Sequence, residues 1–234
     1  MSRHFEHAAG IWADFPTLVP GVILVQGITP DADTTERAAA LVDVAAARLA
    51  VSSEGGFPEV QAWRRAFTQM GLKPTQYRCA SESLLRRYRK EGSLPPLHPL
   101  VDLCHATSIA FAIPVGAFDV DRIEGDLQVR YAHGDETYLS FTGQAEHPEP
   151  GEVVFADSSG RAHARRWTHR QSCASAVSDT TTTALIITEA LHDTAPTAIR
   201  TLQAALTDAL TTTWHTTPVS AVLSEDAPSF TYQP

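Results

Sequence analysis

Residues 165–172 read Arg-Arg-Trp-Thr-His-Arg-Gln-Ser, which places three arginines, an indole, an imidazole and an amide in one short segment. If a β-strand continues through the segment, alternation sends Arg165, Trp167 and His169 to one face and Arg166 and Thr168 to the other. Guanidinium and indole groups together suit phosphate binding and base stacking. The alternative is an exposed edge strand whose charges prevent pairing with other sheets.

Glu189 is a second candidate for chemistry, because it directly follows the apolar run at residues 184–188. A carboxylate at the end of a buried strand needs a partner, which is either an arginine of the protein or a cationic group of a ligand. Glu136 and Asp157 also follow strand-like segments. Asp119 and Asp121 have a simpler interpretation as residues that cap turns.

Motifs of well-known enzyme classes are missing, since the sequence has no GxGxxG, P-loop, HExxH or GxSxG. The ten histidines show no recognised metal-ligand spacing, and the three cysteines, Cys79, Cys104 and Cys173, form no CxxC pair. We therefore expect free thiols in a reducing compartment, the cytoplasm, and no metal site. The first residues lack the apolar region of a secretory signal, and no apolar run is long enough to span a membrane.

The formal net charge of -9 and the pI near 5.5 argue against a general binder of DNA or RNA, which would need Lys and Arg to neutralise phosphates. They still allow a protein that grips only the end of an RNA through a few arginines. The most basic stretch is at residues 81–91, with Arg86, Arg87, Arg89 and Lys90. Such a run is usually a solvated helix face, and contact with RNA is the alternative.

Periodicity and turn residues predict an α+β fold in a single domain, residues 1–234, with a core at about 20–210 and a polar tail at 216–234. A mixed, largely antiparallel sheet is expected to be covered by helices. The expected helices run from a capping Asp33 to about residue 51, and over 58–70, 81–91, about 99–113 and 196–214. The expected strands are 21–28, 126–132, 136–141, 152–157, 161–168 and 182–189.

Several segments, taken in order, resemble the B3/B4 domain of the phenylalanyl-tRNA synthetase β subunit. Residues 100–108 (LVDLCHATS) and 114–125 (PVGAFDVDRIEG) resemble its "VDxxN" helix and "PxHAFDxDKIxG" loop. Residues 151–157 (GEVVFAD) and 178–182 (SDTTT), leading to Glu189, resemble its later strands. Residues 73–81 and the segment RRWTHRQ are closer to free-standing relatives of that domain. The resemblance spans roughly residues 20–210.

The resemblance implies an α+β domain that hydrolyses the ester of a wrongly attached amino acid on tRNA. Free-standing members resemble trans-editing deacylases, some acting on non-protein amino acids. The implied partner is the 3′ end of aminoacyl-tRNA, with no DNA and no membrane. Two alternatives stay open: a non-catalytic module that binds tRNA ends or a protein, and a hydrolase of free amino-acid or peptide esters. The resemblance also implies neither a metal nor an organic cofactor.

The resemblance and the chemistry of the reaction together assign site residues. A water must be placed near the ester carbonyl, and we assign this to His105 and Gln171; a satisfied helix histidine is the alternative for His105. The substrate-binding residues are Asp102, Cys104, Gly116, Glu136, Arg166, Trp167, His169, Arg170, Ser178 and Glu189. Among these, Arg166 and Arg170 would hold phosphate or ribose, Trp167 would stack, and Glu136 and Glu189 would receive the ammonium or a cationic side chain.

The sequence also departs from the family pattern at several of these positions. His105 stands where the family has Asn, and Gly116 stands where the synthetase has His. Thr168 and His169 replace the Asn-Trp of free-standing members. The choice of amino acid therefore does not follow from the resemblance.

Overall fold

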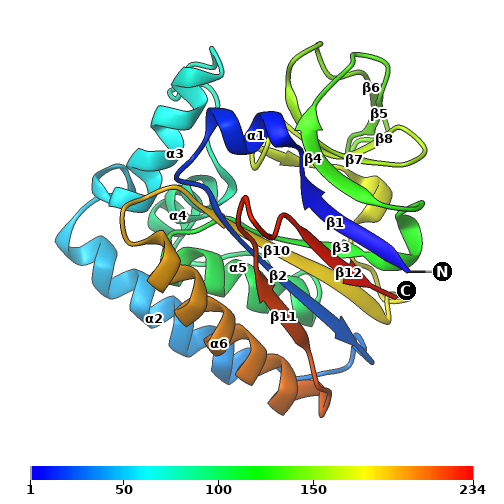
Figure 1. Ribbon diagram of the computed structural model, residues 1–234. Coiled ribbons are helices and arrows are strands. Elements are labelled where there is room, and N and C mark those ends of the chain that lie inside the picture. Colours follow the sequence, from blue (N-terminus) through cyan, green and yellow to red (C-terminus); the bar gives the residue numbers. More distant parts are fainter. Residues whose placement is uncertain (1, 234) are drawn as a thin grey trace.

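The computed structural model describes residues 2–233 and places helices and β-sheets in separate layers (Figure 1). Its α-helices are α1 (Ala9–Asp14), α2 (Thr35–Val51), α3 (Pro58–Gln69), α4 (Ala80–Glu91), α5 (Pro99–Phe111) and α6 (Ala195–Trp214). Proline stands in the first turn of α3, α5 and α6, where its missing N–H has no partner to lose. Gly92 ends α4 in the left-handed conformation.

The strands form two sheets. One sheet has the order β11 (Val219–Val222), β2 (Val19–Gln26), β10 (Thr183–Ala190), β3 (Val115–Asp119), and all its pairings are antiparallel. The other has the order β12 (Ser229–Tyr232), β1 (Arg3–His7), β4 (Leu127–Tyr131), β7 (Val153–Asp157), β8 (Arg161–Arg165), β5 (Thr137–Leu139), β6 (Ala145–Glu146), with β9 (Arg170–Gln171) also paired to β8. In this second sheet β1–β4 and β5–β8 are parallel pairs.

Strand β10 is buried on both faces, and this explains its continuous apolar sequence. Ala184 and Ile186 pack in the cluster formed with α5 and α6. Leu185 and Ile187 point the other way, into the core between the two sheets. The layers are therefore helices, four-stranded sheet, and larger sheet, and alternation carries Glu189 to the inter-sheet side with Leu185 and Ile187.

The α+β class is confirmed, and most expected elements are present within a few residues. Three details differ. The helix at 35–51 is preceded by Thr34 at its N-cap, so Asp33 lies one residue too early for the expected capping box, and its carboxylate accepts from the Thr35 N–H at 2.9 Å. The strand expected at 161–168 ends at Arg165.

The third difference concerns the two ends of the chain. The stretch at 216–234, expected to be a polar tail, contains β11 and β12, and β12 pairs with β1. Phe5 of β1 and Trp12 of α1 belong to the inter-sheet core, as do Phe230 and Tyr232 of β12. The packed core thus extends beyond residues 20–210. No helix among residues 2–233 has the length and apolar character needed to cross a bilayer.

Candidate active site

A bipartite cleft opens beside β3 and β9. A small cavity of about 80 Å³, here called the inner pocket, lies between the two sheets and is lined by Gly116, Phe118, Phe155, Trp167, Ile187 and Glu189 among others. A wider hollow of about 660 Å³, the outer groove, is lined by α4, α5 and residues 176–179. Ala80, Val115, His169 and Gln171 line both compartments. The two compartments are therefore neighbours that share the side chains of His169 and Gln171.

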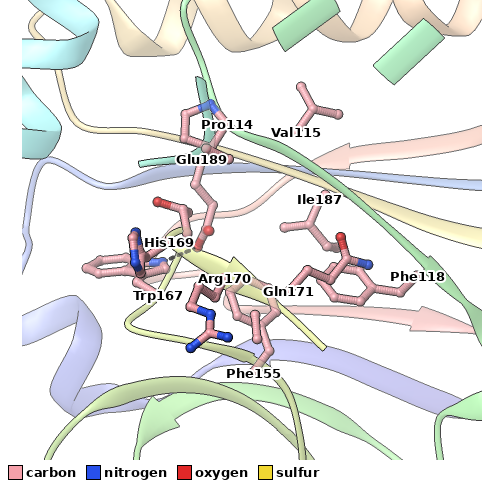
Figure 2. Close-up of a pocket in the computed structure, with 14 residues that line it drawn as sticks. Pro114, Val115, Phe118, Phe155, Trp167, His169, Arg170, Gln171, Ile187 and Glu189 are labelled. Atoms are coloured by element: carbon pink, nitrogen blue, oxygen red, sulfur yellow. Dashed lines mark hydrogen bonds between the residues drawn. The ribbon is translucent and has the colours of Figure 1, made fainter. Parts of the chain in front are cut away.

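Glu189 lies at the inner end of this cleft (Figure 2). Its side chain is 2% exposed, and its Oε1 accepts hydrogen bonds from His7 Nε2 at 2.7 Å and Trp167 Nε1 at 2.9 Å. His7 Nδ1 is buried without a partner among the described residues, so Nε2 carries the ring's contact with Glu189. No arginine pairs with Glu189 within residues 2–233. A carboxylate without an arginine partner can receive an ammonium or other cation in the pocket.

The segment 165–172 differs from the expected alternating strand. Arg166 and Trp167 have positive φ values of 48° and 56°, and the Trp167 N–H donates to Val153 O at 2.7 Å. The turn directs the indole inward, edge-on to Phe15 and Trp63 at centroid distances of 4.7 and 5.0 Å. Because Trp167 is fully buried, the assignment of base stacking to it is corrected: it donates to Glu189 instead.

The three arginines of this segment lie in different environments. Arg165 is buried and bound to Glu152 and Glu146, so it has a structural role. Arg166 lies over the ring of Tyr77 at 4.8 Å and lines a separate hollow, so its assignment to the cleft is also corrected. Arg170 lines the inner pocket with 40% of its side chain exposed, and its nearest acid, Glu146, is 3.5 Å away.

His169 and Gln171 lie where the two compartments meet. His169 Nδ1 is 2.8 Å from the carbonyl oxygen of Arg78 and 3.3 Å from its backbone nitrogen. The shorter contact favours the tautomer with the proton on Nδ1, which leaves Nε2 as an acceptor. Burial lowers the pKa of His169, so the neutral form is favoured. Gln171 Nε2 donates to Ala117 O at 2.7 Å, and this leaves its Oε1 free to accept. Both side chains thus present an acceptor near the junction.

The α5 residues assigned from sequence lie along the outer groove. His105 and Cys104 line it together with Ser178, and none of the three lines the inner pocket. Burial lowers the pKa of His105 and raises the pKa of the Cys104 thiol to about 12. Asp102 does not line the cleft, and its Oδ1 accepts from the Leu97 N–H at 2.9 Å.

Glu136 lies outside the cleft, in contrast to its assignment as a cation receptor. Burial alone would raise its pKa, but hydrogen bonds from His133 N–H, Arg130 and Gly134 N–H outweigh that effect and lower the pKa to about 2. With His133 and Asp135 it forms the set of side chains within residues 2–233 whose spacing could suit a metal ion. Its oxygens are already occupied, and the set is not part of either cleft compartment.

A Ser–His–Asp arrangement is present that the spacing of the sequence did not indicate. His163 Nδ1 lies 2.7 Å from Ser175 Oγ, and its Nε2 lies 3.0 Å from Asp157 Oδ2. Ser175 and His163 have no exposed surface and line neither compartment. The hydroxyl therefore cannot attack a substrate in this conformation. The hydrogen bonds of the three residues instead hold the segment before residues 176–179 against β7 and β8.

Sequence reasoning missed several residues of the cleft. His7 comes from β1, whose contact with β10 spans almost the whole chain, and nothing local marks it. Phe118 and Phe155 stack at 5.5 Å and form apolar walls, for which alternation within their strands was the usable signal. Leu97 and Phe141 line the outer groove and are exposed, which sequence patterns alone cannot distinguish from core residues.

Comparisons with known proteins identify the family of the chain. The B3/4 domain family matches residues 62–210. The phenylalanine–tRNA ligase β subunit of Bradyrhizobium diazoefficiens is 34% identical over 67 residues, which are 29% of this chain and 8% of that protein. The corresponding subunit of Cereibacter sphaeroides is 34% identical over 74 residues, 32% of this chain and 9% of that protein.

A solved structure shows the same fold over nearly the whole chain. It is an N-terminal fragment of the phenylalanyl-tRNA synthetase β subunit from Pyrococcus horikoshii, with a TM-score of 0.50 and 9% identity, covering 98% of this chain and 54% of that one. The family match covers well over half of the chain. The protein belongs to the B3/4 domain family.

Proposed function

We propose that this protein is a trans-editing deacylase that hydrolyses the ester linking a wrong amino acid to tRNA. The observation that carries the proposal is the bipartite cleft, which has a carboxylate without an arginine partner among the described residues in its inner pocket and two acceptors where its compartments meet. The inner pocket has room for a small aminoacyl group, and the outer groove has room for a nucleoside. An aminoacyl ester that occupies both places its carbonyl beside His169 and Gln171.

Binding of the aminoacyl group follows from the inner pocket's walls. Glu189 attracts the α-ammonium or a cationic side chain, while Phe118, Phe155 and Ile187 contact its methylenes. A Cβ at Gly116 would lie 3.2 Å from Phe118 Cε2, so a side chain at this position would crowd the pocket. The absence of a side chain at Gly116 therefore leaves space for the ligand in the inner pocket. The amino acids that this pocket could accept include non-protein amino acids.

Hydrolysis requires only a positioned water. His169 Nε2 and Gln171 Oε1 accept hydrogen bonds from this water and orient its lone pair toward the ester carbon. The water oxygen bonds to that carbon, the carbon–ribose oxygen bond breaks, and the water proton passes through His169 to the ribose oxygen. The products are the free amino acid and tRNA with its hydroxyl restored. Arg170 can stabilise the charge that develops on the carbonyl oxygen.

Covalent catalysis by the groups nearest this chemistry is disfavoured. Burial raises the pKa of Cys104 to about 12 and that of Cys79 to about 11, so both thiols stay protonated. Ser175 is enclosed. His105, which lines only the outer groove, contacts the nucleoside in this scheme rather than the water. Buried free thiols are also compatible with a reducing compartment, and we assign the reaction to the cytoplasm.

The test is a deacylation assay with a panel of tRNAs charged with correct, incorrect and non-protein amino acids. At least one charged tRNA should lose its amino acid faster than in buffer, and small amino-acid esters should react much more slowly. Hydrolysis of small esters at the same efficiency would replace the proposal with a free-ester hydrolase. No acceleration on any tRNA, together with saturable tRNA binding, would indicate a non-catalytic binding module.

A further inference from the structure

The outer groove contains an aromatic side chain that is exposed to solvent. Phe141 lies in the turn between β5 and β6, lines the groove and is 69% exposed. Hydrogen bonds hold the turn in shape: Ser140 N–H donates to Gln144 O and Gly143 N–H donates to Ser140 O, each at 2.9 Å. Leu97, also in the groove lining, is 64% exposed. Covering large apolar side chains of this exposure with a flat ring is favourable, because it removes their apolar surface from water.

A buried hydrogen-bond donor lines the same groove. His98 is 5% exposed, and its Nδ1 accepts from the Leu100 N–H at 3.2 Å at the start of α5. Burial lowers the pKa of His98, so the ring is favoured as neutral with its proton on Nε2. His98 Nε2 has no hydrogen-bond partner among the described residues. A buried donor without a partner is costly unless a ligand acceptor completes it.

Positive charge continues from the groove along α4. Ser83 and Leu84 line the groove, and Arg87 follows one turn later, near enough to affect the titration of His105. Arg86, Arg87, Arg89 and Lys90 border a second hollow, together with Glu91. Arg86 and Arg89 share the buried Glu54, and Arg87 Nε pairs with the exposed Glu91 at 2.9 Å, while Lys90 has no ion pair within residues 2–233. Because Asp179 lines the groove elsewhere, a phosphate is favoured on the α4 side.

We infer that the outer groove binds the terminal nucleotides of a single-stranded RNA end, with Phe141 and Leu97 against a base, His98 Nε2–H toward an acceptor, and Arg87 and Lys90 toward phosphates. This inference rests on the proposed function and assigns the nucleotide contacts to residues outside the segment 165–172. Stacking on an aromatic side chain tolerates any base, so the arrangement suits an end shared by different tRNAs.

The experiment measures binding of 5′-fluorescein-labelled single-stranded RNA and of uncharged tRNA by fluorescence anisotropy. Phe141→Ala should weaken both by about 5- to 150-fold, the range that corresponds to removal of one stacked base. Phe141→Trp should bind within a fewfold of the unchanged protein. Val51→Ala is the matched control, since Val51 is 89% exposed and lies at the end of α2, outside both cleft compartments.

The salt dependence separates phosphate binding from stacking. The double change Arg87→Ala and Lys90→Ala should reduce the slope of log K against log [salt] by about 0.7 for each phosphate that these side chains neutralise in the unchanged protein. The double change Arg65→Ala and Arg200→Ala removes equal charge elsewhere and should leave the slope unchanged. The inference would be overturned if the two double variants had equal slopes or if Phe141→Ala kept full affinity. It would also be overturned if neither RNA bound saturably. Deacylation by the unchanged protein in those cases would leave the proposed function standing.

Discussion

Replacement of Glu189 by glutamine isolates the charge of the inner pocket from its shape. The amide oxygen of Glu189→Gln can still accept from His7 Nε2 and Trp167 Nε1, which now reach Oε1 at 2.7 and 2.9 Å. The substitution removes a charge-assisted hydrogen bond to the substrate ammonium, which contributes about 1.5–3 kcal/mol. We therefore expect kcat/KM for deacylation to fall about 10- to 150-fold. Steady-state kinetics with one responsive charged tRNA measures this fall.

The stability of Glu189→Gln should not fall together with its kcat/KM. The change removes a buried charge whose desolvation cost is several kcal/mol and keeps the hydrogen bonds, so Tm should stay the same or rise. Glu189→Ala would instead leave two buried N–H donors unpaired, at about 1–3 kcal/mol each, and would confuse instability with weakened binding.

A matched control is Glu136→Gln, which alters another buried carboxylate outside the cleft. It should lower stability by about 3 kcal/mol, because Arg130 no longer has a charged partner, and leave kcat/KM within about twofold for the folded protein. If Glu189→Gln keeps full kcat/KM at an unchanged Tm, the carboxylate does not meet the substrate, and the assignment of the inner pocket to the aminoacyl group fails.

Further predictions concern the rest of the cleft. Arg170→Ala should lower kcat/KM about 10- to 100-fold with little change in Tm, and Arg170→Lys should recover little, because an ammonium lacks the planar fork; effects within twofold for both would remove Arg170 from the site. Ser175→Ala should lower stability by about 1–3 kcal/mol by leaving His163 incompletely paired, yet keep kcat within a fewfold, as unfolding curves and kinetics can show; trapping of an acyl-serine would contradict this. Since burial lowers the pKa of His169 and protonation would occupy its accepting nitrogen, kcat/KM should stay level as pH falls to about 6.5 and decline only below it. An acidic limb above pH 6.5, or one that persists in His169→Gln, would refute this role. The same depressed histidine pKa values predict that stability decreases as pH falls below about 6.5, because the unfolded chain then binds more protons.

The sequence predicted the fold class and part of the cleft lining because those features are carried by local patterns. The apolar run before Glu189 and the proline-initiated helix with His105 are visible in a few adjacent residues. Periodicity also located β7, β8 and β10 to within a few residues. Turn residues and strand composition therefore predict a segment correctly when its conformation depends mainly on its own residues.

The segment 165–172 could not be interpreted in this way. Glu152 accepts from the side chain of Arg165 and from the Arg166 N–H, and this distant carboxylate holds the chain where two non-glycine residues turn left-handed. Alternation assumes an extended backbone, so it placed Trp167 on a binding face when tertiary contacts bury it. The strand β12 was missed for a different reason: its alternation of exposed Ser229 and Thr231 with buried Phe230 and Tyr232 is short and lies among polar residues.

The bond between His7 and Glu189 makes one end of the chain part of the cleft. A fragment limited to residues 62–210 would retain Trp167 and Glu189 but would lack β1, β2 and β11. Glu189 would then have no imidazole donor. During folding, the pocket can reach its final form only after β1 has docked beside β4, so competence for catalysis should appear later than most of the secondary structure. A bulky fusion joined close to Arg3 would act on the chemistry of the cleft through this strand, although it would lie far from His169 in sequence.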